Sequence, residues 1–89
     1  MVRKRVRFSG IVQGVGFRMT CRHAASDHGL SGWVKNEPDG TVLMEVQGEP
    51  GAVEAMLDHL REVRAGCIEG EDHTDLPPAP EETAFEIRR

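Results

Sequence analysis

The stretch Gly10–Arg18, GIVQGVGFR, decides how the rest of the chain is interpreted. Its first seven residues include three glycines, which is too many for a helix or strand and suits a tight loop with positive φ. The preceding segment, Lys4–Ser9, alternates polar and apolar residues as a half-buried strand does. The following segment, Phe17–His28, has apolar residues at helical spacing and stops at Gly29. A strand therefore runs through a glycine-rich loop into a helix.

A hairpin and a second helix are predicted beyond this first helix. Ser31–Asn36 is a short strand, the turn Glu37–Gly40 (EPDG) follows it, and Thr41–Gln47 is an apolar, β-branched strand. The second helix begins near Pro50 and ends before Gly66. Its apolar positions recur at helical spacing: Val53, Met56, Leu57, Leu60 and Val63.

The last third of the chain gives weaker signals. Cys67–His73 contains Ile68 as its only strong strand former, so it predicts a short and poorly determined strand. The run Leu76–Pro80 (LPPAP) breaks regular structure and predicts a loop. Ala84–Arg88 again alternates apolar and charged residues, which predicts a closing strand.

The order of these elements predicts the fold class. Strand, helix, strand, strand, helix and strand in succession indicate an α+β, ferredoxin-like sandwich (βαββαβ). In this fold two helices cover one face of an antiparallel sheet, here of four to five strands. A chain of 89 residues rarely holds two cores, so residues 1–89 are predicted to form a single domain. The fold alone does not define a function.

The charges are unevenly distributed along the chain. Residues 1–35 carry seven of the eleven bases and only one of the fifteen acids, although the net charge is −4. An acidic chain is not suited to nucleic acid, whose binding needs many phosphate contacts, so a small anionic ligand is the expected partner of the basic half. Arg3, Arg5 and Arg7 alternate along the first strand and are interpreted as a solvated strand edge.

Composition also bounds the setting in which the protein works. No apolar run approaches the roughly 20 residues that span a bilayer, and the start, MVRKRVRFSG, lacks the apolar stretch of a signal peptide. Cys21 and Cys67 are too few for a disulfide framework and are interpreted as free thiols. We therefore expect a cytoplasmic protein without membrane contact, and a monomer because no long apolar stretch is offered to a partner.

The glycine-rich loop suits a tetrahedral anion. Glycines let successive N–H groups point inward, and the start of a helix adds a partial positive charge. Arg18 lies in the first turn of that helix, and a guanidinium matches phosphate oxygens in pairs. The dinucleotide pattern GxGxxG does not fit, because it needs glycine where Met19 stands, and the P-loop Lys-Ser/Thr pair is absent. For the glycines alone, a merely tight strand-to-helix turn is an equally good interpretation.

The whole string GIVQGVGFR resembles the first acylphosphatase signature, roughly G-x-V-Q-G-V-x-[FY]-R. A second stretch, Gly32–Gly48, resembles the other signature of that family, G-[FYW]-V-x-N-x3-G-x-V-x5-G, at the proper spacing. The matching residues are Gly32-Trp33-Val34-Lys35-Asn36, Asp39-Gly40-Thr41-Val42 and Gln47-Gly48. Because both motifs occur in one short chain, the sequence is identified as similar to the acylphosphatases.

The resemblance implies a small enzyme that uses neither a metal nor another cofactor. It cleaves the carboxyl-phosphate bond of acyl phosphates and gives a carboxylate and inorganic phosphate. Carried over by motif position, Arg18 binds the phosphate and Asn36 positions water. The resemblance also implies that the phosphate meets the loop backbone at Gln13, Gly14, Val15, Gly16, Phe17 and Arg18.

The residue types agree with that chemistry. Phosphoryl transfer mainly requires positioning and charge stabilisation, and a carboxylate leaves without a proton. Asn36 cannot act as a base at neutral pH, but its carboxamide can orient a water molecule. Without the motif, Asn36 is better explained as the residue that opens the following turn by bonding its own backbone.

Three alternatives belong to other classes of function. The run Met19–Ala24 (MTCRHA) resembles the start of a copper- or zinc-binding MTCxxC motif, but Ala24 stands where the second cysteine is needed. An RNA-recognition module shares the element order but needs aromatic residues on its central strands, and Thr41–Val46 has none. A non-catalytic domain that binds a small anion is disfavoured by the presence of both Arg18 and Asn36.

Overall fold

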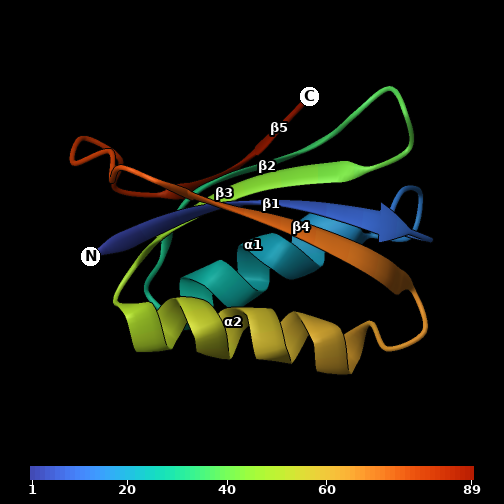
Figure 1. The fold of residues 1–89 in the computed structure, drawn as a ribbon, viewed down its shortest axis with the longest axis horizontal. Helices are drawn as coiled ribbons and strands as arrows, with labels where there is room; N and C mark the ends of the chain where they lie inside the picture. Colours follow the sequence, from blue (N-terminus) through green and yellow to red (C-terminus); the bar gives the residue numbers. More distant parts are fainter.

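Two helices and five strands follow one another in the predicted order, and the computed structural model describes all of residues 1–89 (Figure 1). The strands are β1 (Val2–Gly10), β2 (Ser31–Asn36), β3 (Val42–Gly48), β4 (Ile68–Leu76) and β5 (Phe85–Arg88), and the helices are α1 (Phe17–Asp27) and α2 (Pro50–Val63). The strands form one sheet in the order β4-β1-β3-β2-β5. Both helices cover the same face of this sheet, below it in Figure 1, which confirms the predicted ferredoxin-like α+β arrangement.

The hydrophobic core fills the space between the helices and the sheet. It is a cluster of sixteen buried residues, to which alternate positions of the strands and one stripe of each helix contribute. Phe17, the first residue of α1, is part of this core and packs edge-on against Phe8, with 5.0 Å between the ring centroids. Burying a phenylalanine contributes about 2–3 kcal/mol. The core therefore fixes the start of α1 against β1.

The last strand makes the sheet mixed. β5 pairs with β2 in parallel, with Gly32 opposite Phe85, whereas the other three strand pairings are antiparallel. The prediction of a wholly antiparallel sheet is therefore wrong for this one pairing. The reason lies in residues 77–84, which lead from one edge strand to the other and turn the chain so that β5 runs in the direction of β2.

β4 is longer and better defined than the sequence predicts. It has nine residues and pairs with β1 from Ile68 to Leu76. Its composition is poor in strand formers, but β1 offers a continuous row of backbone partners, and such context outweighs intrinsic β-propensity. An ion pair of 2.9 Å between Arg61 of α2 and Glu71 also joins β4 to the layer below.

The arginines of β1 do not lie on a free edge, because β1 sits between β4 and β3. Arg3 is buried, and its guanidinium donates hydrogen bonds to Glu45 and Glu82. Glu45 also accepts a hydrogen bond from the Arg5 guanidinium. Nη1 of Arg7 lies 3.7 Å from Oε1 of Glu37. Burial alone would raise the pKa of Glu45, but the hydrogen bonds from Arg5 and Arg3 outweigh it and lower that pKa.

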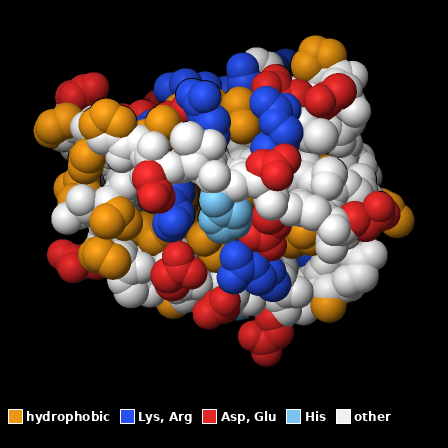
Figure 2. All heavy atoms as spheres, in the orientation of Figure 1, with side chains coloured by type: hydrophobic (Ala, Val, Ile, Leu, Met, Phe, Trp, Pro, Cys, Tyr) orange, Lys and Arg blue, Asp and Glu red, His pale blue; other side chains and the backbone are white.

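These ion pairs even out the charge asymmetry of the sequence. The basic first strand is paired with acids from the C-terminal half, so the interpretation of its arginines as a solvated edge is wrong. Figure 2 shows basic and acidic side chains interspersed over the viewed face. Residues 77–84 take part in this pairing, because Glu82 meets Arg3 and the backbone of Ala79 exchanges two hydrogen bonds with Gln47. The basic half of the sequence is therefore not a general anion-binding surface.

Candidate active site

Two glycines shape the loop between β1 and α1. Gly14 and Gly16 adopt the left-handed conformation, with φ of 73° and 77°, which costs a residue with a Cβ about 1–2 kcal/mol. A Cβ at Gly14 would meet nothing within 4 Å, so the conformation rather than the space requires glycine there. Gly16 directly precedes α1, and no side chain caps the helix. The first N–H groups of α1 are therefore available to an anion.

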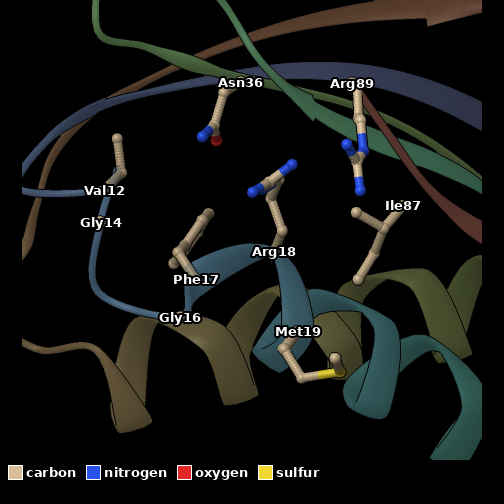
Figure 3. Close-up of a pocket in the computed structure, with 9 residues that line it drawn as sticks. All are labelled: Val12, Gly14, Gly16, Phe17, Arg18, Met19, Asn36, Ile87 and Arg89. Atoms are coloured by element: carbon tan, nitrogen blue, oxygen red, sulfur yellow. The ribbon is translucent and has the colours of Figure 1, made fainter.

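A cavity of about 500 Å³ opens beside this loop (Figure 3). Its walls come from the loop, the first turn of α1 and the ends of β2 and β5. Nine residues line it: Val12, Gly14, Gly16, Phe17, Arg18, Met19, Asn36, Ile87 and Arg89. Two of these are arginines and none is acidic, so a bound anion experiences a positive potential.

Arg18 is the first of the two cations. It is the second residue of α1, and its side chain extends from the helix into the cavity (Figure 3). Its Nη1 donates one hydrogen bond of 3.3 Å to the backbone oxygen of Arg88 at the end of β5. No carboxylate pairs with this guanidinium, in contrast to the arginines of β1. The remaining N–H groups of Arg18 are therefore free to bind phosphate oxygens in pairs.

Asn36 faces the same cavity from the end of β2 (Figure 3). Its Oδ1 is buried and accepts no hydrogen bond from the protein. An unsatisfied buried acceptor destabilises the folded state by about 1–3 kcal/mol, so such groups are rare outside functional sites. The turn-opening interpretation of Asn36 is not supported, because that interpretation needs a hydrogen bond from its side chain to the backbone. Asp39 makes that kind of bond instead, because its Oδ1 accepts a hydrogen bond from the backbone N–H of Thr41.

Not all the loop residues named from the sequence line the cavity. Gly14, Gly16 and Phe17 do, whereas Gln13 and Val15 do not. The Gln13 side chain instead donates to the backbone oxygens of Glu37 and Thr41, at 2.7 and 2.9 Å. These bonds tie the loop to the turn that follows Asn36. Gln13 thus sets the position of one wall of the cavity relative to the other.

A second set of hydrogen bonds supports the loop from below. The Thr20 hydroxyl donates to the backbone oxygen of Gly16 at 3.1 Å, and Arg64 donates to that hydroxyl at 2.7 Å. Arg64 directly follows α2, so these bonds link the end of one helix to the start of the other. The link holds Gly16 in place at the rim of the cavity.

Four residues that line the cavity were not among the site residues predicted from the sequence. Val12 and Met19 lie next to the loop glycines and Arg18, while Ile87 and Arg89 come from the end of the chain. Ile87 and Arg89 could have been found from the sequence. The alternation along Ala84–Arg88, continued by one residue, places both on the face of the sheet that packs on the helices. What the sequence could not show was that this strand lies beside β2.

The thiol of Cys21 has no role at this site. Cys21 is fully buried in the core, and burial raises its pKa to about 12.

No three His, Cys, Asp or Glu side chains of the chain gather closely enough to hold a metal ion. The metal-carrying alternative therefore finds no ligand set. The structure also contains no helix that is both long enough and apolar enough to cross a membrane.

One cavity at the edge of this two-layer α+β fold brings together a glycine loop, the start of a helix and a free guanidinium. This combination is typical of a small enzyme domain that acts on phosphate groups. The sequence relationships agree: residues 4–87 match the acylphosphatase family, and the chain belongs to it. An acylphosphatase of Oceanobacillus iheyensis is 37% identical over 86 residues, or 94% of each chain. One of Rhizobium etli is 52% identical over 63 residues, which cover 71% of this chain and 67% of the relative.

The fold is also that of a solved relative. The crystal structure of acylphosphatase from Bacillus subtilis matches with a TM-score of 0.92 at 28% identity, covering 100% of both chains. The predictions of the family, of the fold and of an enzyme are therefore confirmed. The function is that of an acylphosphatase, which hydrolyses an acyl phosphate to a carboxylate and inorganic phosphate.

Proposed function

We propose that the cavity beside the glycine-rich loop is the active site. The backbone N–H groups of residues 13–18 and the guanidinium of Arg18 bind the phosphoryl group, and Asn36 holds the attacking water. One observation carries this proposal: a guanidinium without a carboxylate partner and a buried acceptor without a donor face the same cavity. Both groups are stabilised when a phosphoryl group and a water molecule lie between them.

The reaction needs few protein groups. The water oxygen attacks phosphorus, the bond from phosphorus to the acyl oxygen breaks, and the electron pair of that bond leaves with the carboxylate. Negative charge on the non-bridging oxygens is stabilised by the loop N–H groups and by Arg18. The leaving carboxylate is a weak base, so no general acid is required. The cavity is lined by no Asp, Glu or His, so the proton of the water passes to a phosphate oxygen of the substrate.

Asn36 acts by orientation rather than by proton transfer. Its Oδ1 accepts a hydrogen bond from the water and thereby directs a lone pair of the water toward phosphorus. Holding a nucleophile in line in this way lowers the entropic part of the barrier. The hydrogen bonds of Gln13 fix the distance between the loop and the end of β2, so they also set the distance between phosphate and water.

We propose that the reaction requires neither a metal ion nor another cofactor. In metal-dependent phosphatases a cation neutralises the charge that develops on the phosphoryl oxygens. Here that task falls to the Arg18 guanidinium and the loop N–H groups. Both cysteines are free thiols, the state expected in a reducing compartment, and this supports the proposed cytoplasmic location.

The protein is proposed to act as a monomer. Only five large apolar side chains are more than a third exposed, and one wall of the cavity includes one of them, Met19. Each protomer builds its cavity from its own residues, so the site is complete without a partner. Size-exclusion chromatography with light scattering tests this proposal, and a mass close to 9.8 kDa is expected.

The function is tested by following hydrolysis of benzoyl phosphate with a chelator in excess. We expect turnover by the parent protein, and a loss of about a hundredfold or more in Arg18→Ala and in Arg18→Lys, because an ammonium does not offer the paired donors of a guanidinium. Arg22→Ala is the matched control, since Arg22 is exposed one turn further along α1 and lies outside the cavity. Equal activity of Arg18→Ala and the parent would refute the proposed site.

A further inference from the structure

We propose that Arg89 is a specificity-determining residue. The structure points to a preference for acyl phosphates whose acyl group carries a second negative charge, such as a remote carboxylate. This inference rests on the proposed function, because it assumes that the phosphoryl group lies at the loop. It goes beyond that function by assigning a recognition site for the acyl group.

The strand register indicates that Arg89 lies on the face of the sheet that carries the proposed water-binding residue. β5 runs parallel to β2, and Ile87 lies opposite Val34. Successive side chains of a strand point to opposite faces of the sheet, so Arg89 points to the same face as Ile87. That face also carries Asn36, two residues beyond Val34. Figure 3 shows the guanidinium of Arg89 directed into the cavity, on the side of Arg18 that is away from the loop.

Arg89 differs from its neighbour in having no partner in the protein. The Arg88 guanidinium lies over the ring of Trp33, 4.9 Å from its centroid, and 3.8 Å from the carboxylate of Glu86. Arg89 forms neither an ion pair nor a hydrogen bond, although ten ion pairs join other Lys and Arg side chains of this small chain to carboxylates. A free cation at the wall of a cavity without acids is suited to an anionic group of a ligand.

The phosphoryl group does not need this second cation. Its proposed ligands are the loop N–H groups and Arg18, and the loop lies on the side of the cavity away from Arg89 (Figure 3). Ile87 lies next to Arg89 on this wall and is apolar, and the exposed side chain of Met19 lies beyond Ile87 (Figure 3). Apolar side chains suit the methylene groups of an acyl chain, and a charged group at the rim fixes its orientation. The outer end of the acyl chain is therefore the part of the substrate that reaches Arg89.

The preference should be moderate rather than absolute. Arg89 is exposed, so with an uncharged acyl group its guanidinium stays hydrated and no buried charge is left unpaired. With a carboxylate, the guanidinium gains one charge-assisted pair. At a solvent-exposed site such a pair corresponds to at most about a fivefold change in kcat/KM, with a dependence on ionic strength.

The test compares two substrates of equal chain length. Glutaryl monophosphate ends in a carboxylate and pentanoyl phosphate ends in a methyl group, and the spontaneous decay of each is subtracted. The measured quantity is the ratio of their kcat/KM values in the parent protein, in Arg89→Gln and in Arg22→Gln. The two acyl groups differ in intrinsic reactivity, but this difference is the same in every protein. It therefore cancels when the ratios of two proteins are compared. Arg22 is the matched control because it is also exposed and unpaired, but it lies outside this cavity.

We expect the ratio to fall about threefold to fivefold in Arg89→Gln and to stay unchanged within error in Arg22→Gln. Added salt should lower the ratio in the parent protein but not in Arg89→Gln. An unchanged ratio, whether or not both rates fall together, overturns the inference, because it means that Arg89 does not distinguish the acyl groups. Failure of the proposed function itself is a separate result, recognised by the absence of turnover of either substrate by the parent protein.

Discussion

Replacing Asn36 by alanine should separate catalysis from stability in an unusual direction. Most buried polar side chains stabilise the fold through their hydrogen bonds, so their loss destabilises it. The Oδ1 of Asn36 is buried but accepts no bond from the protein, and its cavity wall is open to ligand. We therefore expect Asn36→Ala to lose turnover while the free energy of unfolding does not decrease.

The sizes of the two effects follow from the structure. A desolvated acceptor without a donor destabilises the folded protein by about 1–3 kcal/mol, and alanine removes it. The packing lost at the cavity wall offsets about 1 kcal/mol of this gain. The free energy of unfolding should thus stay equal or rise by about 1 kcal/mol, which for a domain of this size is a rise in Tm of about 4–8 °C. Loss of the water-orienting group should lower kcat by about a hundredfold or more.

Three measurements check this prediction: kcat with benzoyl phosphate, inhibition by inorganic phosphate, and thermal unfolding. The phosphate inhibition constant should change by less than about threefold, because Arg18 and the loop are unaltered. Lys35→Ala is the control, since Lys35 is one residue away on the opposite face of β2. A large loss of phosphate affinity with intact turnover, or a clear loss of stability, would refute the role given to Asn36.

Further predictions concern the loop, the buried ion pairs and the thiols. Gly16→Ala should lower the free energy of unfolding by about 1–2 kcal/mol, because Gly16 has a φ of 77°. Gly51→Ala, within α2, should instead raise it by about 0.5 kcal/mol. Urea titrations measure both changes, and equal effects of the two substitutions would contradict this prediction. Glu45→Gln should destabilise the fold by about 3 kcal/mol, because it breaks a largely buried ion-pair network. The folded-state pKa of Glu45 lies below the ordinary 4.5. The stabilisation that ionised Glu45 gives the fold is therefore present above about pH 4.5 and is lost as the pH falls. The free energy of unfolding should thus fall more steeply with acid in the parent protein than in Glu45→Gln. In native protein at pH 8, iodoacetamide should modify Cys67 and spare Cys21, as peptide mass spectrometry can show; rapid labelling of Cys21 would mean that the core opens readily.

The motif residues explain why the fold and five of the nine residues that line the cavity could be predicted. Gly10–Arg18 contains its own local instructions, because the glycines permit the loop and the apolar spacing after them starts a helix. The hairpin that ends β2 is equally local, so Asn36 could be placed at a strand end. Features that depend on nearby residues were therefore predicted correctly.

Features that depend on distant residues were not. Arg3 carries no sign in its neighbourhood that Glu45 and Glu82, more than 40 residues away, bury it in ion pairs. The length of β4 depends on its partner β1 rather than on its own composition. Arg89 was missed because its place in the cavity requires the parallel pairing of β5 with β2.

That parallel pairing has a consequence for how the enzyme is made. Of the four strand pairings, only β2–β3 joins strands that are neighbours in the sequence, so the native contacts are mostly non-local. Mixed α/β topologies of this kind fold more slowly than helical bundles of the same length. During synthesis the loop and Arg18 leave the ribosome long before β5 does, and the wall that contains Ile87 and Arg89 is still missing at that point. A nascent chain therefore has the complete cavity only when β5 docks beside β2.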